Sequence, residues 1–110
     1  MLTRADIFDF NTNKWSTGNK IPTQRAGAMT VSVGNDVIVM GGESKGVKTA
    51  RDSVEAFNVT TGKWRKLQPL KVGRHSGAAA ILDSKIHVVS GSERIGGSPE
   101  SQVHETLLLQ

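Results

Sequence analysis

The chain of 110 residues has the length of one domain, and its 36% apolar residues and 12 glycines are typical of a folded protein rather than a disordered one. It has no cysteine, which excludes disulfides, thiolate metal ligands and cysteine nucleophiles. The 14 basic and 10 acidic residues give a net charge of +4 but are scattered singly, without the clustered basic face that nucleic-acid binding requires.

Short strands separated by turns are predicted along the whole chain, because runs of β-branched and apolar residues alternate with segments rich in Gly, Asn and Asp. In chain order the predicted strands cover residues 5–10, 14–17, 26–33, 37–40, 52–59, 63–67, 77–82, 86–89 and 102–109. The polar segments 43–50 and 90–101 are predicted to be loops. Helical periodicity does not extend over ten residues anywhere, so the predicted fold class is all-β.

The chain also repeats itself at a spacing of 49 residues. The first members of the recurring pairs are Phe8, Lys14, Trp15, Arg25, Val39 and Gly42, and the second members are Phe57, Lys63, Trp64, Arg74, Val88 and Gly91. A fixed period near 50 is typical of propeller blades built from four strands. One such unit cannot bury its own apolar face, so further copies must pack against it.

The order of elements within one period resembles the kelch repeats. One full unit reads Arg25-Ala26-Gly27, then Val37-Ile38-Val39-Met40-Gly41-Gly42, then Asp52-Ser53-Val54-Glu55-Ala56-Phe57-Asn58 and finally Gly62-Lys63-Trp64. The second unit departs from the pattern at Ser90, which replaces the first glycine of the pair, and no tryptophan-bearing strand follows Val103.

This resemblance implies kelch-type β-propeller blades, each a four-stranded antiparallel sheet. We expect a single kelch-repeat segment over residues 1–110, with a partial blade at 1–22, a complete blade at 23–71 and an incomplete blade at 72–110. Propellers use about 4–8 blades, so these are too few for a closed ring in one chain. The chain is then either a fragment of a longer protein or part of a homo-oligomer, in which three copies would complete a six-bladed ring.

The candidate ligand-binding residues precede the inner strand of each repeat. In kelch proteins arginines at the positions of Arg25 and Arg74 face the mouth of the central pocket, and guanidinium groups bind carboxylates in a bidentate manner. Gln24, His75 and Ser76 flank them and complete the predicted site. The alternative is that each arginine bonds loop carbonyls or an acid of a neighbouring blade.

No catalytic or metal-binding residue is predicted. The three histidines, His75, His87 and His104, do not have the spacing of a zinc site. Four acids, Asp9, Asp52, Glu55 and Glu105, are associated with strands, and no hydrolytic pair is predicted among them. Glu55 and Glu105 lie near corresponding repeat positions and are interpreted as blade surface or as partners between blades. We therefore expect no cofactor.

The predicted function is a kelch-repeat binding module that presents loops and arginines to a protein segment or another acidic ligand. The alternative is a fragment of a bacterial enzyme similar to the sialic-acid mutarotases (N-acetylneuraminate epimerases); a third possibility is a purely structural blade pair. The copper oxidase chemistry of some kelch-like propellers is excluded for this chain, since it uses cysteine and tyrosine, which are both absent.

The sequence contains no apolar run of about 18 residues and no secretory signal after Met1. We therefore expect a soluble protein without a membrane partner, cytoplasmic or, for a bacterial fragment, periplasmic.

Overall fold

Nine antiparallel strands make up the regular structure in the computed structural model, which describes residues 2–97 and 100–108. The strands are β1 (Asp6–Asp9), β2 (Lys14–Thr17), β3 (Met29–Val33), β4 (Asp36–Met40), β5 (Val54–Asn58), β6 (Trp64–Leu67), β7 (Ala78–Leu82), β8 (Lys85–Val89) and β9 (Glu105–Leu108). These residues include no helix, and hence none able to cross a membrane. The all-β prediction is confirmed, and each predicted strand is present.

The strand boundaries differ most at the start of the inner strands. Residues 26–33 were expected to be one strand, but β3 begins at Met29 because Gly27 adopts a positive φ of 64° and turns the chain. The last strand begins at Glu105 rather than at residue 102. Leu109, at the predicted end of that strand, lies outside the described residues, as do Met1 and part of the predicted loop at 90–101.

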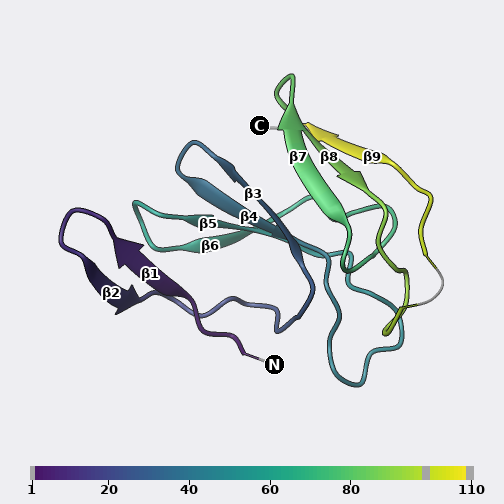
Figure 1. The fold of residues 1–110 in the computed structure, drawn as a ribbon, viewed down its shortest axis with the longest axis horizontal. Helices are drawn as coiled ribbons and strands as arrows, with labels where there is room; N and C mark the ends of the chain where they lie inside the picture. The colour runs from purple at the N-terminus through teal and green to yellow at the C-terminus, as the bar shows by residue number, and fades with distance from the viewer. Residues whose placement is uncertain (1, 98–99, 109–110) are drawn as a thin grey trace.

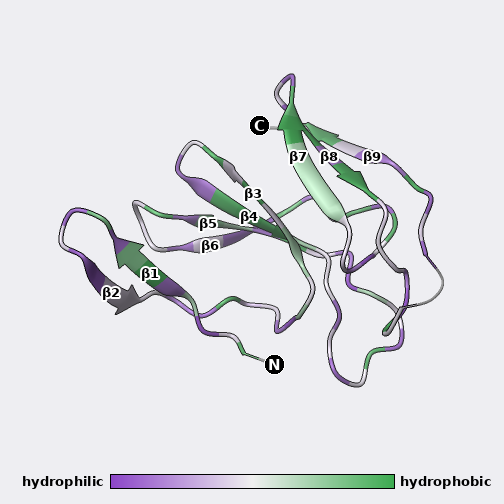
Figure 2. Ribbon diagram, viewed as in Figure 1, coloured by the Kyte–Doolittle hydropathy of each residue, from purple (hydrophilic) through white to green (hydrophobic). Residues whose placement is uncertain are grey.

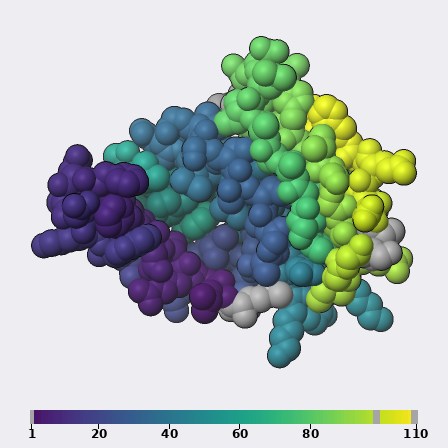
Figure 3. Space-filling model, viewed as in Figure 1, coloured from purple at the N-terminus to yellow at the C-terminus, as the bar shows by residue number. Residues whose placement is uncertain are grey.

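The strands form three separate sheets in chain order (Figure 1). β1 and β2 form a two-stranded sheet, β3 to β6 a four-stranded sheet, and β7 to β9 a three-stranded sheet. Each strand pairs with its neighbour in sequence, as in a propeller blade, and the three sheets make an open arrangement rather than a ring. The molecule measures 44 × 35 × 21 Å, with the N-terminal hairpin and the third sheet at opposite ends (Figure 3).

The repeat seen in the sequence is also a repeat of register. Glu55 pairs with Val39 in the second sheet, and Glu105 pairs with Val88 in the third. The first two sheets repeat an aromatic contact as well. The rings of Phe8 and Trp15 lie 5.2 Å apart between centroids, and those of Phe57 and Trp64 lie 5.1 Å apart. Equivalent positions in sequence therefore occupy equivalent positions in the sheets.

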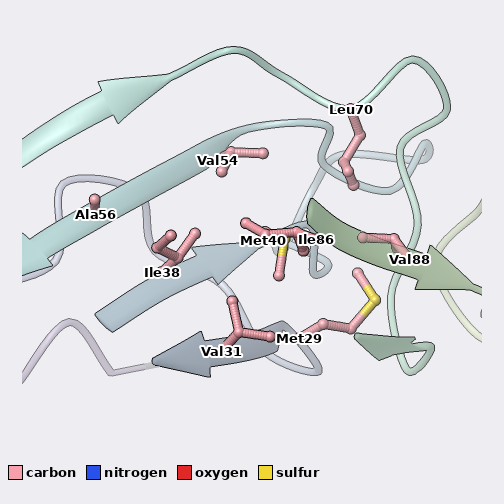
Figure 4. Close-up of a cluster of buried hydrophobic side chains, with 9 residues drawn as sticks. All are labelled: Met29, Val31, Ile38, Met40, Val54, Ala56, Leu70, Ile86 and Val88. Carbon is pink, nitrogen blue, oxygen red and sulfur yellow. The ribbon is translucent and has the colours of Figure 1, made fainter. Parts of the chain in front are cut away.

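The hydrophobic core lies between the second and third sheets. One face of the second sheet contributes Met29, Val31, Ile38, Met40, Val54 and Ala56, and Leu70, Ile86 and Val88 cover it from the other side (Figure 4). Figure 2 shows that β4, in the interior of the second sheet, is largely apolar, whereas the outer strand β6 is largely polar. Fully burying each of the large aliphatic side chains stabilises the fold by about 1.5–3 kcal/mol.

The two sheets approach closely at the glycine pair that ends β4. The N–H of Gly42 donates to the carbonyl of Arg74 at 2.8 Å, and a Cβ on Gly41 would collide with that same carbonyl. Gly41 also has a φ of 67°, which side chains oppose. A glycine is therefore required here both by conformation and by the neighbouring sheet.

Candidate functional site

The long loops of the second and third sheets lie together at the end of the strands opposite the tight turns at 34–35 and 83–84 (Figure 1). Two backbone hydrogen bonds join them, from Ala50 to Glu93 at 2.9 Å and from Ile95 to Lys48 at 2.8 Å. We call residues 43–53 and 91–97, together with His75 and Ser76, the loop surface. Because the loops are bonded to each other, this surface is continuous across both sheets.

Arg25 lies beneath this surface rather than on it. Its guanidinium donates to the carboxylate of Glu55, and its Nη1 also donates to the carbonyls of Gly41 at 2.7 Å and Ser53 at 2.8 Å. The side chains of Arg25 and Glu55 are each 1% exposed. Burial lowers the pKa of Arg25, and the Glu55 carboxylate opposes that shift.

Arg74 makes the same kind of cross-link in the third sheet. Its Nη2 donates to Glu105 Oε2 at 2.6 Å, and its Nη1 donates to the carbonyl of Val103 at 2.5 Å. Glu105 also accepts two backbone N–H groups, from Lys71 at 2.6 Å and from Val72 at 2.9 Å. Burial raises the pKa of Glu105, but these N–H groups and the Arg74 guanidinium together hold it below its ordinary value.

Both arginines are therefore bonded to loop carbonyls, as in the alternative interpretation. The acid that each one contacts belongs to its own sheet, however, and not to a neighbouring blade. A ligand carboxylate that reaches either guanidinium has to displace Glu55 or Glu105. Breaking a buried ion pair by removing one partner costs about 3–5 kcal/mol, because it leaves a buried charge uncompensated. This geometry favours a role for Arg25 and Arg74 in positioning the loops.

His75 and Ser76 lie together at the loop surface. His75 Nδ1 is 2.9 Å from the Ser76 hydroxyl, and its Nε2 is 2.8 Å from the carbonyl of Arg94. Glu43 Oε2 is 3.5 Å from the same Nε2. Since both neighbours of Nε2 are acceptors, Nε2 donates to the Arg94 carbonyl, and Nδ1 lies within hydrogen-bond distance of the Ser76 hydroxyl. The ring is buried, whereas Ser76 is exposed to solvent.

Ser76 has a positive φ of 59°, and the residue at the corresponding position of the second sheet is Gly27, with a φ of 64°. Ser76 thus adopts a backbone conformation that is strained for a residue with a side chain, and its hydroxyl lies where Gly27 of the other repeat has no side chain. The exposed hydroxyl, polarised by His75, can bond a polar group of a ligand.

Gln24 lies at the edge of the same surface, and its side chain is exposed. The Ser44 hydroxyl donates to the Gln24 carbonyl at 2.5 Å, and Arg51 Nε donates to Ser44 Oγ at 2.8 Å. These contacts fix the loop after β4 to the segment before β3. They bring Gln24 next to the loop surface, although the two segments are about twenty residues apart in the chain.

The structure adds residues that the sequence analysis did not single out. Glu43 reaches from the second sheet to the third, where it accepts the N–H of Gly96 at 3.1 Å. Lys45, Lys48 and Arg94 are exposed cations on the loop surface. Lys45 and Arg94 are 49 residues apart and hold the same charge at equivalent positions of the two repeats, whereas the position equivalent to Lys48 is Gly97. The repeat period is thus the sequence signal that could have singled out Lys45 and Arg94.

The described residues contain no group of three or more His, Asp or Glu side chains that could hold a metal ion.

Comparison with known proteins places these features in context. Residues 24–71 match the family model described as the Kelch motif. The chain is 31% identical over 99 residues to N-acetylneuraminate epimerase of Haemophilus influenzae (strain 86-028NP), which covers 83% of this chain and 26% of that protein. It is also 25% identical over 95 residues to alpha-scruin of Limulus polyphemus, and this aligned region covers 84% of this chain and 10% of that protein.

Among solved structures, the structure of YjhT superposes with a TM-score of 0.65 and 23% sequence identity, over 74% of this chain and 25% of that one. This similarity shows a shared fold. The chain spans between about a tenth and about a quarter of the length of these relatives.

Proposed function

The chain belongs to the kelch-repeat family, and on this premise we propose that it is a binding module whose loop surface recognises an acidic segment of a partner protein. The observation that carries the proposal is the continuous loop surface, which is joined across two sheets and displays Lys45, Lys48 and Arg94. Rigid strands that hold variable loops are a common arrangement for recognition.

Within this site we assign the predicted residues two different roles. Gln24 and Ser76 offer exposed polar groups to the ligand, and His75 orients the Ser76 hydroxyl. Arg25 and Arg74 are positioning residues, because their guanidinium groups hold the loop carbonyls beneath the surface. The exposed cations supply the attraction to acidic groups, which falls as salt screens it.

The test is a titration of the isotope-labelled chain with an extended peptide rich in Asp and Glu, followed by NMR. We expect amide shifts confined to residues 43–53, 75–76 and 91–97, and weaker binding at high salt. Replacing Lys48 and Arg94 together by serine is expected to weaken binding by about tenfold, since two exposed ion pairs are lost.

The matched control replaces Lys63 and Lys85 by serine, which removes the same charge near the tight turns at the other end of the strands. Equal weakening by both double variants, or equal binding of a peptide with Lys in place of each acid, would contradict the proposal. Shifts centred on other segments would do the same.

The likeness to the Haemophilus influenzae epimerase favours a second candidate, an isomerase of an anionic sugar such as sialic acid. Glu43 and His75 would then be the pair that moves a proton, since they lie within 3.5 Å of each other at the loop surface. The measurement is the rate at which the anomers of N-acetylneuraminate interconvert with and without the protein. No acceleration by folded protein would eliminate this candidate.

We also propose that the three sheets correspond to three blade segments, the partial blade 1–22, the complete blade 23–71 and the incomplete blade 72–110. Limited proteolysis tests these boundaries. Cleavage is expected first near residues 20–23, because the N-terminal hairpin contributes no residue to the buried core between the other two sheets.

A further inference from the structure

One face of the third sheet is exposed, although the corresponding face of the second sheet is buried. The strand register aligns His87 with Ile38, since His87 pairs with Thr106 as Ile38 pairs with Ala56. It also aligns His104 with Val54, because each directly precedes the glutamate of the arginine cross-link. Ile38 and Val54 are 3% and 2% exposed, whereas His87 is half-buried and His104 exposed.

The two histidines contact each other at the centre of this face. His87 lies in the middle of β8, which is itself the middle strand of the sheet, and its Nδ1 is 3.0 Å from His104 Nε2. The ring centroids are 5.2 Å apart and the ring planes are inclined at 37°. Two imidazole nitrogens therefore lie side by side, with no further His, Asp or Glu grouped around them in the described part of the chain.

The 3.0 Å distance is that of a hydrogen bond between the two rings, and it also falls within the range that two imidazole ligands of one metal ion require. Nitrogens that bind one ion at about 2.0–2.1 Å are about 2.9 Å apart at a right angle, and about 3.3 Å apart at a tetrahedral angle. The observed 3.0 Å is nearer to the first value. Cis nitrogen ligands at a right angle are typical of Cu²⁺ and Ni²⁺, and Cu²⁺ binds nitrogen sites most tightly among the divalent ions of its row.

We propose that His87 and His104 form a two-histidine site for a divalent transition-metal ion on the exposed face of β7–β9. The ion replaces the hydrogen bond between the rings, and water fills its remaining positions. His104 is exposed, so its ring can turn to direct its lone pair at an ion shared with His87. The site lies on a sheet face and shares no residue with the loop surface, so it is independent of the proposed function.

The test uses the full chain titrated with Cu²⁺ alone at pH 7.5, with Ni²⁺ and Zn²⁺ for comparison. We expect one bound Cu²⁺ per chain, an electron paramagnetic resonance spectrum with two equatorial nitrogens, and weaker binding of Zn²⁺. In NMR spectra the ring signals of His87 and His104 should broaden at low Cu²⁺, while those of the buried His75 remain sharp.

The variants His87→Gln and His104→Gln are each expected to weaken Cu²⁺ binding by at least about tenfold. Both side chains lie on an exposed face, so circular dichroism should show an unchanged fold. Cu²⁺ binding equal to that of the wild type in either variant overturns the proposal, as does a spectrum with fewer than two nitrogens. Broadening of His75 first would likewise place the ion elsewhere.

Discussion

The second and third sheets present the same face with the same register, and only one of these faces is covered. On the second sheet the positions of Ile38 and Val54 are aliphatic and pack against the third sheet. On the third sheet the same positions hold His87 and His104, and the neighbouring inner-strand residues are exposed alanines. The third sheet therefore keeps the backbone pattern of the repeat, although the side chains on this face do not pack against another sheet.

The arginine cross-links differ in the same two sheets. Both carboxylate oxygens of Glu105 have partners, including the N–H groups of Lys71 and Val72. In the second sheet Glu55 Oε2 and Arg25 Nε are buried without a hydrogen-bond partner among the described residues. The position that corresponds to Lys71 there is Pro22, which has no N–H to donate. The sheet with the exposed face thus has the more complete cross-link.

The two arginine cross-links are expected to stabilise the fold by different amounts. Glu105→Ala should destabilise the chain by about 3–5 kcal/mol, because it leaves the buried Arg74 guanidinium uncompensated. Glu55→Ala should cost less, because the Glu55 carboxylate makes fewer hydrogen bonds. Urea unfolding of both variants, with the loss of tryptophan fluorescence as the signal, measures the two costs. A larger cost for Glu55→Ala than for Glu105→Ala would contradict this prediction.

The next effect concerns the glycine pair. Gly41→Ser should destabilise by about 2–4 kcal/mol, because the new side chain meets the Arg74 carbonyl and opposes a positive φ. The reverse change at the corresponding position, Ser90→Gly, should alter stability by less than about 1 kcal/mol, since Ser90 already adopts a φ of 64° without a sheet above it. Thermal unfolding of the two variants is the measurement, and equal destabilisation would contradict it.

Ser90 also affects whether copies of the chain can assemble into a ring. In a head-to-tail ring of copies, the Arg25 carbonyl of the next copy would approach Ser90 as the Arg74 carbonyl approaches Gly41, and the serine side chain obstructs that approach. We therefore expect a molar mass near 11.8 kDa by light scattering. A wild-type trimer would show that copies close the ring despite Ser90.

A smaller effect is expected from pH. The folded-state pKa of Glu105 is below its ordinary value, so its stabilising contribution is present above the ordinary pKa of about 4.3 and is lost as the pH falls through the folded pKa. The Arg65 guanidinium lowers the pKa of Asp36 at the surface, so the stabilising contribution of Asp36 is also lost as the pH falls. Stability measured from pH 6 downward should fall less steeply in Glu105→Gln than in Asp36→Asn. A steeper fall in Glu105→Gln would contradict this assignment.

The smallest effect tests the exposed face itself. His87→Ile restores the residue of the second sheet on a surface that nothing in the described structure covers, so stability should change by less than about 0.5 kcal/mol. The matched variant Ile38→His places a polar ring in the core and should cost several times more. Thermal unfolding of the pair measures the difference, and similar costs would indicate that the face around His87 is buried in solution.

Much of this structure could be predicted from the 49-residue period and the turn residues, because both act locally. They predicted the strands and the family. The burial of Arg25 could not be predicted, since it depends on Glu55, which is 30 residues away in sequence. The contact of His87 with His104, 17 residues apart, and the reach of Glu43 to His75 arise only when the strands are in register.

The peptide group between Gly41 and Gly42 joins the two arginines. Its carbonyl accepts from the Arg25 side chain, and its N–H donates to the Arg74 backbone. This peptide plane cannot rotate without losing both bonds, so the Gly42 amide is released to solvent only when the two sheets separate. Its rate of hydrogen exchange therefore reports the free energy of opening between blades, distinct from the fraying of either sheet.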